Sequence, residues 1–190
     1  MNPALLFPAT VFGFLGGAAL GRSRRELSML PPDKSSPLPG VPLCRWERFV
    51  AVMVSAPKRT LTPRGRWGMF GMDARRLADV GFMSEPKKTV LGAEQGVWTG
   101  RWRPPLDQQK FLESAGAQDE AFARSMRGLV PAVAGHVGAV VDGKRATLSG
   151  LLAAGHVAGE VGVQGWVADP AVRQKFRATT ANFERANGIF

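Results

Sequence analysis

The chain contains 190 residues, of which 45% are apolar, so it can form one domain with a buried core and still carry an appended segment. The 21% of charged residues is typical of a folded protein and excludes a chain that is disordered throughout. A formal charge of +10 favours anionic partners, such as nucleic acid, acidic lipid headgroups or an anionic cell-wall polymer, with a solvated basic surface as the alternative.

Residues 3–21 (PALLFPATVFGFLGGAALG) carry no charge and are followed at once by the basic run GRSRRE. About 20 apolar residues suffice to cross a bilayer, so residues 1–27 are interpreted as a membrane span or as an apolar arm that packs into a larger assembly. In a span, the basic run would keep the rest of the chain on the cytoplasmic side. A cleavable signal peptide fits less well, because its basic residues would precede the apolar stretch.

Residues 28–42 contain the proline- and serine-rich run LPPDKSSPLPGVP. Each proline blocks a helix and stiffens the chain, which predicts an extended linker. The boundary of the folded domain is therefore placed here, and the domain itself covers residues 43–190.

The first core helix is predicted over residues 42–56, because apolar side chains recur there at helical spacing. Pro42 suits the first helical position, and Pro57 ends the run. Cys44 is the only cysteine of the chain, which excludes an internal disulfide. It lies among apolar residues, and we expect it in the core.

Further elements follow along the chain. Asp73 is expected to cap a helix that ends at Gly81. Residues 82–105 lack a helical period and predict a long loop or a small β excursion. Two helices are then predicted, over residues 106–114 and 118–130.

The C-terminal part is predicted to be helical as well. Residues 147–157 are apolar almost all round, which indicates a buried central helix. After a short turn around residues 164–167, Asp169 is expected to cap a last helix that buries Phe176 and ends at Gly188. The fold class predicted from these elements is all-α, a mainly helical domain with little β structure, preceded by an apolar N-terminal helix and the Pro-rich linker.

Three segments of the domain form a series: the helix of residues 42–56, GMFGMD (68–73) after a tryptophan, and AAGHVAGEVGV (153–163). The second resembles the G-L-M-Q-V-D segment that lines the glycan groove in goose-type lysozymes and lytic transglycosylases. The third is similar to the A-A-Y-N-A-G-P-G-x-V segment of the same superfamily. WTGR (98–101) and QDEAF (118–122) between them resemble the phage-encoded relatives. The resemblance spans the whole predicted domain and implies a lysozyme-like fold.

The resemblance also implies a glycan groove formed by two of these segments. The residues that it assigns to the groove are Trp67, Gly68, Met69, Phe70, Gly71, Ala154, His156 and Gly159. The family has glutamine where Gly71 stands, and a glycine has no side-chain amide to offer a sugar. Trp67, Trp98 and Trp102 present faces that suit sugar rings, although burial in the core is the commoner role of tryptophan. His156 is interpreted as hydrogen-bonded packing rather than as a base.

Cleavage of a glycosidic bond needs a carboxylic acid that stays protonated in an apolar groove near neutral pH. The resemblance implies that this acid ends the first core helix, where the present chain has the sequence VSAP (54–57). Glu47 is the only acidic residue of that helix and lies two turns before its end, where a carboxylate simply favours the helix dipole. It is the candidate catalytic acid only if the helix docks in another register.

Positive charge gathers in the first part of the chain, which has 17 basic and 8 acidic residues up to Lys110, against 8 and 7 in the remainder. Four cations, Lys58, Arg59, Arg64 and Arg66, precede the GMFGMD segment and are candidates to contact phosphate or an acidic protein surface, with a solvated loop as the alternative. The sequence has no P-loop, dinucleotide fingerprint, serine triad or zinc-ligand spacing. We therefore expect neither a cofactor nor a metal.

These observations predict a structural, virion- or tail-associated protein of a phage or phage-derived particle, built on a catalytically degenerate lysozyme-like domain. Its partners would be other virion or tail proteins, together with peptidoglycan strands, or a membrane reached through residues 3–21. One alternative is an active muramidase or lytic transglycosylase, anchored in the bacterial envelope, that uses a displaced carboxylate such as Glu47, Glu85 or Glu94. Another is a basic protein that binds nucleic acid or a membrane surface, with an affinity that falls steeply with salt.

Overall fold

The computed structural model describes residues 35–91 and 95–190. The apolar segment assigned to residues 1–27 lies outside the described residues, as does the first part of the linker. No helix within the described ranges is long and apolar enough to span a bilayer.

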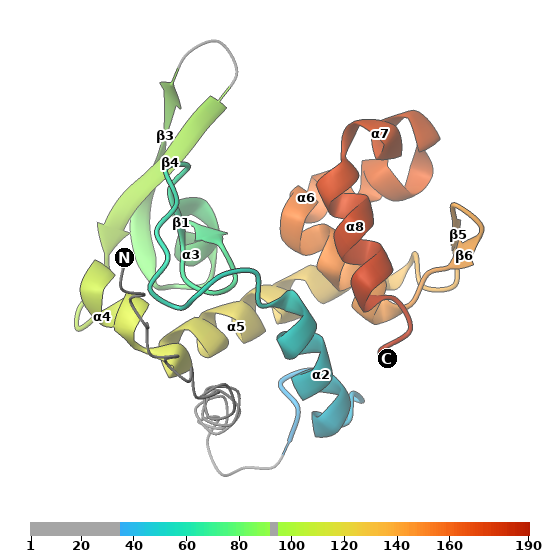
Figure 1. Ribbon diagram of the computed structural model, residues 1–190, viewed down its shortest axis with the longest axis horizontal. Coiled ribbons are helices and arrows are strands. Elements are labelled where there is room, and N and C mark those ends of the chain that lie inside the picture. The colour runs from blue at the N-terminus through green and yellow to red at the C-terminus, as the bar shows by residue number, and fades with distance from the viewer. Residues whose placement is uncertain (1–34, 92–94) are drawn as a thin grey trace, which may run out of the picture.

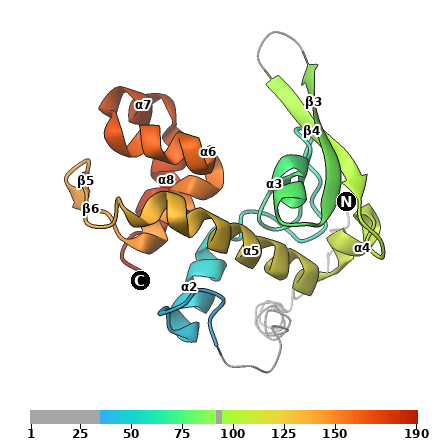
Figure 2. The ribbon, with the colours of Figure 1, turned by 180° about the vertical axis from the view of Figure 1, so that it is seen from behind.

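Two lobes lie toward the two ends of α5 (Ala115–Ala134), the long helix that crosses the molecule (Figure 1). The hairpin lobe consists of β1 (Arg66–Trp67), β2 (Met72–Asp73), α3 (Ala74–Asp79), β3 (Met83–Leu91), β4 (Gln95–Trp102) and α4 (Gln108–Glu113). The helical lobe consists of α2 (Leu43–Met53), β5 (Val140–Val141), β6 (Lys144–Arg145), α6 (Leu148–Ala168), α7 (Pro170–Lys175) and α8 (Arg177–Ala186). Seen from behind, the β3–β4 hairpin extends away from the body of the molecule (Figure 2).

The β structure corrects the predicted fold class. Helices predominate, but three two-stranded antiparallel sheets make the domain mixed α/β rather than all-α. In the longest sheet, β3 pairs with β4 from Met83 opposite Trp102 to Leu91 opposite Gln95. Only one face of this hairpin packs against α3, where a Cβ added to Gly100 would lie 3.6 Å from that of Ala74. Because few side chains of this strand pair are buried, residues 82–105 show no clear alternation of apolar and polar residues. The sequence pattern therefore predicted only a long loop or a small β excursion there.

The core joins the two lobes through aromatic rings around Phe122 of α5. Trp46 and Phe49 of α2 lie 5.9 and 6.0 Å from its ring centroid. From the hairpin lobe, Phe70 stacks on it at 4.1 Å with an interplanar angle of 11°. The inward face predicted for the first core helix is confirmed, since Trp46, Phe49 and Met53 are its buried residues.

Of the other local predictions, the two helix caps are confirmed and the burial of Cys44 is wrong. The caps are confirmed, because Asp73 accepts the Arg76 N–H at 2.9 Å and Asp169 accepts the Ala171 N–H at 2.8 Å. Cys44 is exposed, contrary to expectation, because it lies on the outer face of α2.

The C-terminal elements also differ from the prediction. Residues 164–167 are helical, because α6 continues past a break at Gly159, where φ is 76°. The last helix is in fact two helices, α7 and α8, and Phe176 at their junction is 53% exposed instead of buried. Packing of Val163 and Trp166 in the core explains why the chain resumes its helix after Gly159.

Candidate functional site

The GMFGMD segment forms a tight turn over residues 68–71 that lies against the end of α2. The Ser55 N–H donates to the Met69 carbonyl at 2.8 Å, and the Ser55 hydroxyl donates to the same oxygen at 3.2 Å. Gly71 has a φ of 58°, a conformation that favours glycine over any residue with a Cβ. The position where the resemblance places a catalytic acid therefore holds a serine, and the backbone itself disfavours a glutamine at residue 71.

Glu47 does not lie at this turn. Its side chain is exposed on α2, and it precedes Ser55 by eight residues, which is about 12 Å along a helix axis. Glu47 is also not among the residues that line the cleft described below. Its placement gives it no contact with the assigned groove segment within the described residues.

The aromatic and apolar residues assigned to the groove are buried. Trp67, Met69 and Phe70 are 7%, 6% and 3% exposed. Trp67 meets the edge of Trp102 at a centroid distance of 6.0 Å, so two of the three candidate stacking tryptophans face each other. Ala154 is also fully buried. These side chains build the core and leave little surface for a saccharide.

His156 ties α6 to the same turn. Its Nε2 lies 2.8 Å from the Phe70 carbonyl oxygen, which can only accept, so Nε2 carries the proton. Burial, and then the positive charge of Arg76, lowers the pKa of His156 to about 3, so the ring is neutral. Among the described residues, Nδ1 has no hydrogen-bond partner. The interpretation of His156 as packing agrees with this geometry.

This placement makes His156 a source of acid sensitivity. The pKa of His156 is about 3 in the folded chain, against an ordinary value of 6.5. Between these two pH values the unfolded chain therefore binds a proton at His156 and the folded chain does not. The free energy of unfolding should therefore fall as the pH drops below about 6.5, by up to about 1.4 kcal/mol per pH unit from this group. The variant His156→Gln keeps an N–H donor for Phe70 and should lose this dependence.

Urea unfolding gives the free energy of unfolding of both proteins at about pH 7 and about pH 5. The effect of His156 is the amount by which the difference between the two proteins changes between these pH values. Burial raises the pKa of Asp119 to about 6, which opposes the trend of His156, but it acts in both proteins and cancels. If the free energies of unfolding of the two proteins differ by the same amount at both pH values, His156 is not a neutral, buried group.

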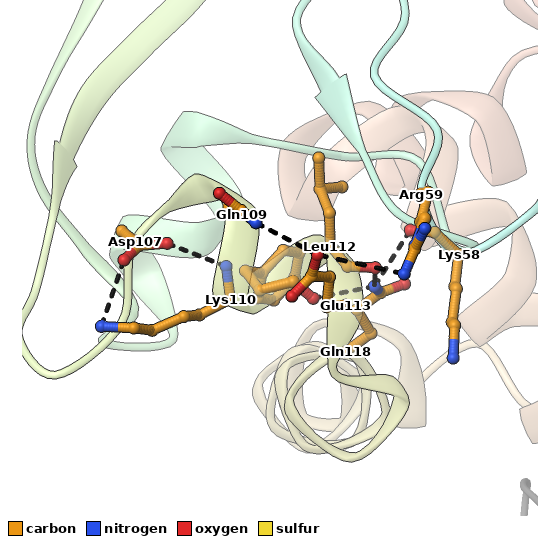
Figure 3. A network of polar contacts seen from close by, with 9 residues as sticks. Lys58, Arg59, Asp107, Gln109, Lys110, Leu112, Glu113 and Gln118 are labelled. Atoms are coloured by element: carbon orange, nitrogen blue, oxygen red, sulfur yellow. Dashed lines mark hydrogen bonds and ion pairs between the residues drawn. The ribbon is translucent and has the colours of Figure 1, made fainter.

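Gln118 of α5 holds the turn from a third side and was not assigned to the site from the sequence. Its Oε1 accepts the Met69 N–H at 2.9 Å, and its Nε2 donates to the Phe111 carbonyl at 2.9 Å. The same Nε2 donates to the Lys58 carbonyl at 3.0 Å (Figure 3). Gly68 makes room for it, since a Cβ there would lie 2.4 Å from Oε1. Helices α2, α5 and α6 thus clamp one turn through Ser55, Gln118 and His156.

An open cleft of about 540 Å³ lies between α3 and the break in α6; we call it the α3–α6 cleft. Residues that line it include Asp73, Arg75, Asp79, Trp98, Gly159 and Glu160. The Arg75 guanidinium carbon lies 5.5 Å from the centre of the Trp98 ring. The cleft therefore combines an aromatic face with charged groups of both signs. It takes Asp73 from the first assigned groove segment and residues 157–162 from the second.

Arg76 forms the inner wall of the α3–α6 cleft. It donates to the Ser125 hydroxyl at 3.0 Å and to the Gly155 carbonyl at 3.4 Å, and burial lowers its pKa from the ordinary value. Both bonds connect α3 across the cleft to α5 and α6. The two lobes are thereby fixed relative to each other at the base of the cleft.

The carboxyls of the cleft are not seated as a glycosidase acid would be. Asp73 accepts a backbone N–H at the start of α3, and Asp79 and Glu160 are exposed to solvent. Asp119, the carboxyl whose pKa burial raises, is on α5 and is not a lining residue. A protonated donor requires apolar surroundings inside the groove, and the three carboxyls of the cleft do not have them.

The four cations assigned to an anionic partner lie at separate places. Lys58 offers its carbonyl to Gln118, and Arg59 lies 3.9 Å from Glu113 of α4. Arg66 lies beside Gly71, and Arg64 is exposed on the turn that leads into β1. The structure thus brings Arg64 and Arg66 to the hairpin and leaves Arg59 near α4.

No family model, curated protein or solved structure matches this chain.

Proposed function

We propose that this chain is a non-catalytic, lysozyme-like binding module of a virion- or tail-associated structural protein, and that it holds peptidoglycan strands in the α3–α6 cleft without cutting them. One observation carries the proposal: the end of α2 presents Ser55, not an acid, to the turn of residues 68–71. The setting in a phage or phage-derived particle rests on the phage-like form of the sequence motifs alone.

The chemistry of the α3–α6 cleft suits a polar, ring-shaped ligand. The face of Trp98 matches the apolar face of a sugar ring, and Arg75 keeps the indole in place. Asp79 and Glu160 can accept hydrogen bonds from sugar hydroxyls. Arg75 and Arg76 can donate to the carboxylates of the short peptides attached to the glycan strands. Such a ligand would contact the residues that line the cleft and not the buried residues first assigned to the groove.

Sedimentation with insoluble peptidoglycan sacculi tests the proposal. The purified full chain should bind sacculi, and Trp98→Ala should weaken binding about tenfold, equivalent to about 1.4 kcal/mol. Phe176→Ala removes an aromatic ring that is 53% exposed on the helical lobe and does not line the cleft, and it should leave binding unchanged.

Two results would overturn this assignment. If the chain fails to bind, or if the two variants bind equally, the cleft does not recognise peptidoglycan. If sacculi dissolve and Glu47→Gln abolishes the dissolution, the chain is instead an enzyme that uses the displaced carboxylate.

A further inference from the structure

The β3–β4 hairpin carries a second feature that the α3–α6 cleft does not explain. Residues 58–103, which include this hairpin, contain ten basic and four acidic residues, so most of the net charge belongs to one lobe. The exposed cations of this surface are Arg64, Arg66, Lys87, Lys88 and Arg101; we call them the basic ribbon face. Within the described part of the chain, only Arg101 of these five has an ion-pair partner, Glu85 at 3.8 Å.

The strand register decides which cations share a face. Lys87 pairs with Thr99 and Ser84 pairs with Arg101, so Lys87, Thr99 and Arg101 project on the side away from α3. Lys88 pairs with Trp98, and its side chain lies across Gly96, where an added Cβ would be 2.3 Å from the lysine Cε. Both faces of the outer hairpin therefore carry positive charge.

The turn that bears Arg64 and Arg66 is fixed to the same ribbon. A Cβ on Gly65 would lie 2.6 Å from Val97 Cγ1 and 3.3 Å from the Trp98 carbonyl oxygen, so this turn packs directly on β4. Its positive φ of 66° is a conformation that glycine adopts without strain. The packing places the turn that carries these two cations beside Val97 and Trp98 of β4.

From this geometry we infer that the basic ribbon face binds double-stranded DNA, with the paired strands β3 and β4 lying in the major groove. Two strands about 4.8 Å apart form a ribbon that the major groove, about 12 Å wide, admits. Lysine and arginine on both faces reach the two phosphate backbones, and the hydroxyl of Thr99 is a further phosphate donor. The contacts are to phosphates, so the binding is independent of base sequence.

The character of the exposed side chains favours DNA over a membrane surface. Apart from Pro86, the described side chains that are exposed on β3 and β4 are charged or bear a hydroxyl. The large hydrophobic side chains most exposed among the described residues, Val140 and Val161, lie on the other lobe. A membrane-binding surface would combine its cations with apolar side chains that insert among the headgroups.

Fluorescence anisotropy with a duplex of about 30 base pairs tests this inference with the full chain between about 50 and 200 mM salt. The double variant Lys87→Gln/Lys88→Gln should lower affinity about tenfold at the lower salt concentration. It should also reduce the slope of log affinity against log salt by about 1.8, because two phosphate contacts are lost. The matched variant Lys175→Gln/Arg177→Gln removes the same charge from α7 and α8 and should change affinity less than twofold.

The controls separate the other outcomes. Equal losses in the two double variants would show that net charge alone drives binding, and would overturn the assignment to the hairpin. Tighter binding to vesicles rich in anionic lipid than to the duplex, with the same dependence on Lys87 and Lys88, would identify a membrane surface instead. The inference is independent of the proposed peptidoglycan binding, since Trp98→Ala should leave the salt slope unchanged.

Discussion

Replacing Phe122 with alanine is expected to lower the free energy of unfolding by about 4 kcal/mol, the largest effect of any single change considered for this protein. Phe122 is fully buried, and its ring lies between α2, the turn of residues 68–71 and α6. It also meets the ring of His156 edge to face at 5.3 Å. Its loss would leave a cavity at the point where the two lobes join.

Urea unfolding followed by tryptophan fluorescence measures this loss. Phe176→Ala is the matched control, because it removes the same atoms from a site that is 53% exposed, and it should cost less than about 1 kcal/mol. Similar losses in the two variants would contradict the central position assigned to Phe122.

Replacing Gln118 with alanine is expected to cost about 3 kcal/mol. Gln118 is 1% exposed, and its amide satisfies the Met69 N–H and the carbonyls of Phe111 and Lys58 at once. Alanine removes these three hydrogen bonds and takes away the side-chain acceptor of the buried Met69 N–H. Gln118→Glu should be at least as damaging at neutral pH, because a carboxylate would face two carbonyl oxygens that need a donor.

Gln109 provides the control for Gln118. It is exposed on α4, and among the described residues its amide donates only to Glu113 in the next turn of the helix, at 3.2 Å (Figure 3). Gln109→Ala should change the free energy of unfolding by less than about 0.5 kcal/mol. If the Gln118 variants are as stable as this control, the turn of residues 68–71 does not depend on the clamp.

The sequence predicted those helices and caps that are formed by interactions between residues close together in the chain. The first core helix, the cap at Asp73 and the helices α4 and α5 follow from apolar spacing and from a single side chain that bonds its own backbone. The β3–β4 hairpin and the continuation of α6 past Gly159 depend on packing against distant residues. A propensity that tertiary contacts override cannot be recognised in a short window of sequence.

The candidate site divides in the same way. The order of the motifs suggested that the GMFGMD segment and the helix of His156 lie together, and the bond between His156 and the Phe70 carbonyl joins them across 86 residues. The role of Gln118 left no local signal, because its partners Met69 and Lys58 lie 49 and 60 residues away. The sequence pattern left burial and sugar binding open for the tryptophans alike, and it could not distinguish Trp67, which is buried, from Trp98, which lines an open cleft.

The most direct test of a domain that binds peptidoglycan without cutting it is a chemical count of the glycan ends released from purified sacculi. The full chain should be incubated with sacculi from about pH 4 to about pH 8, a range that includes the pKa of about 6 for Asp119. The expected result is that the soluble fraction contains no more new sugar ends than the buffer control at any pH, while the protein sediments with the sacculi. New ends that accumulate in proportion to protein and time would contradict the account, because they would require a proton donor at the groove that Ser55 cannot provide.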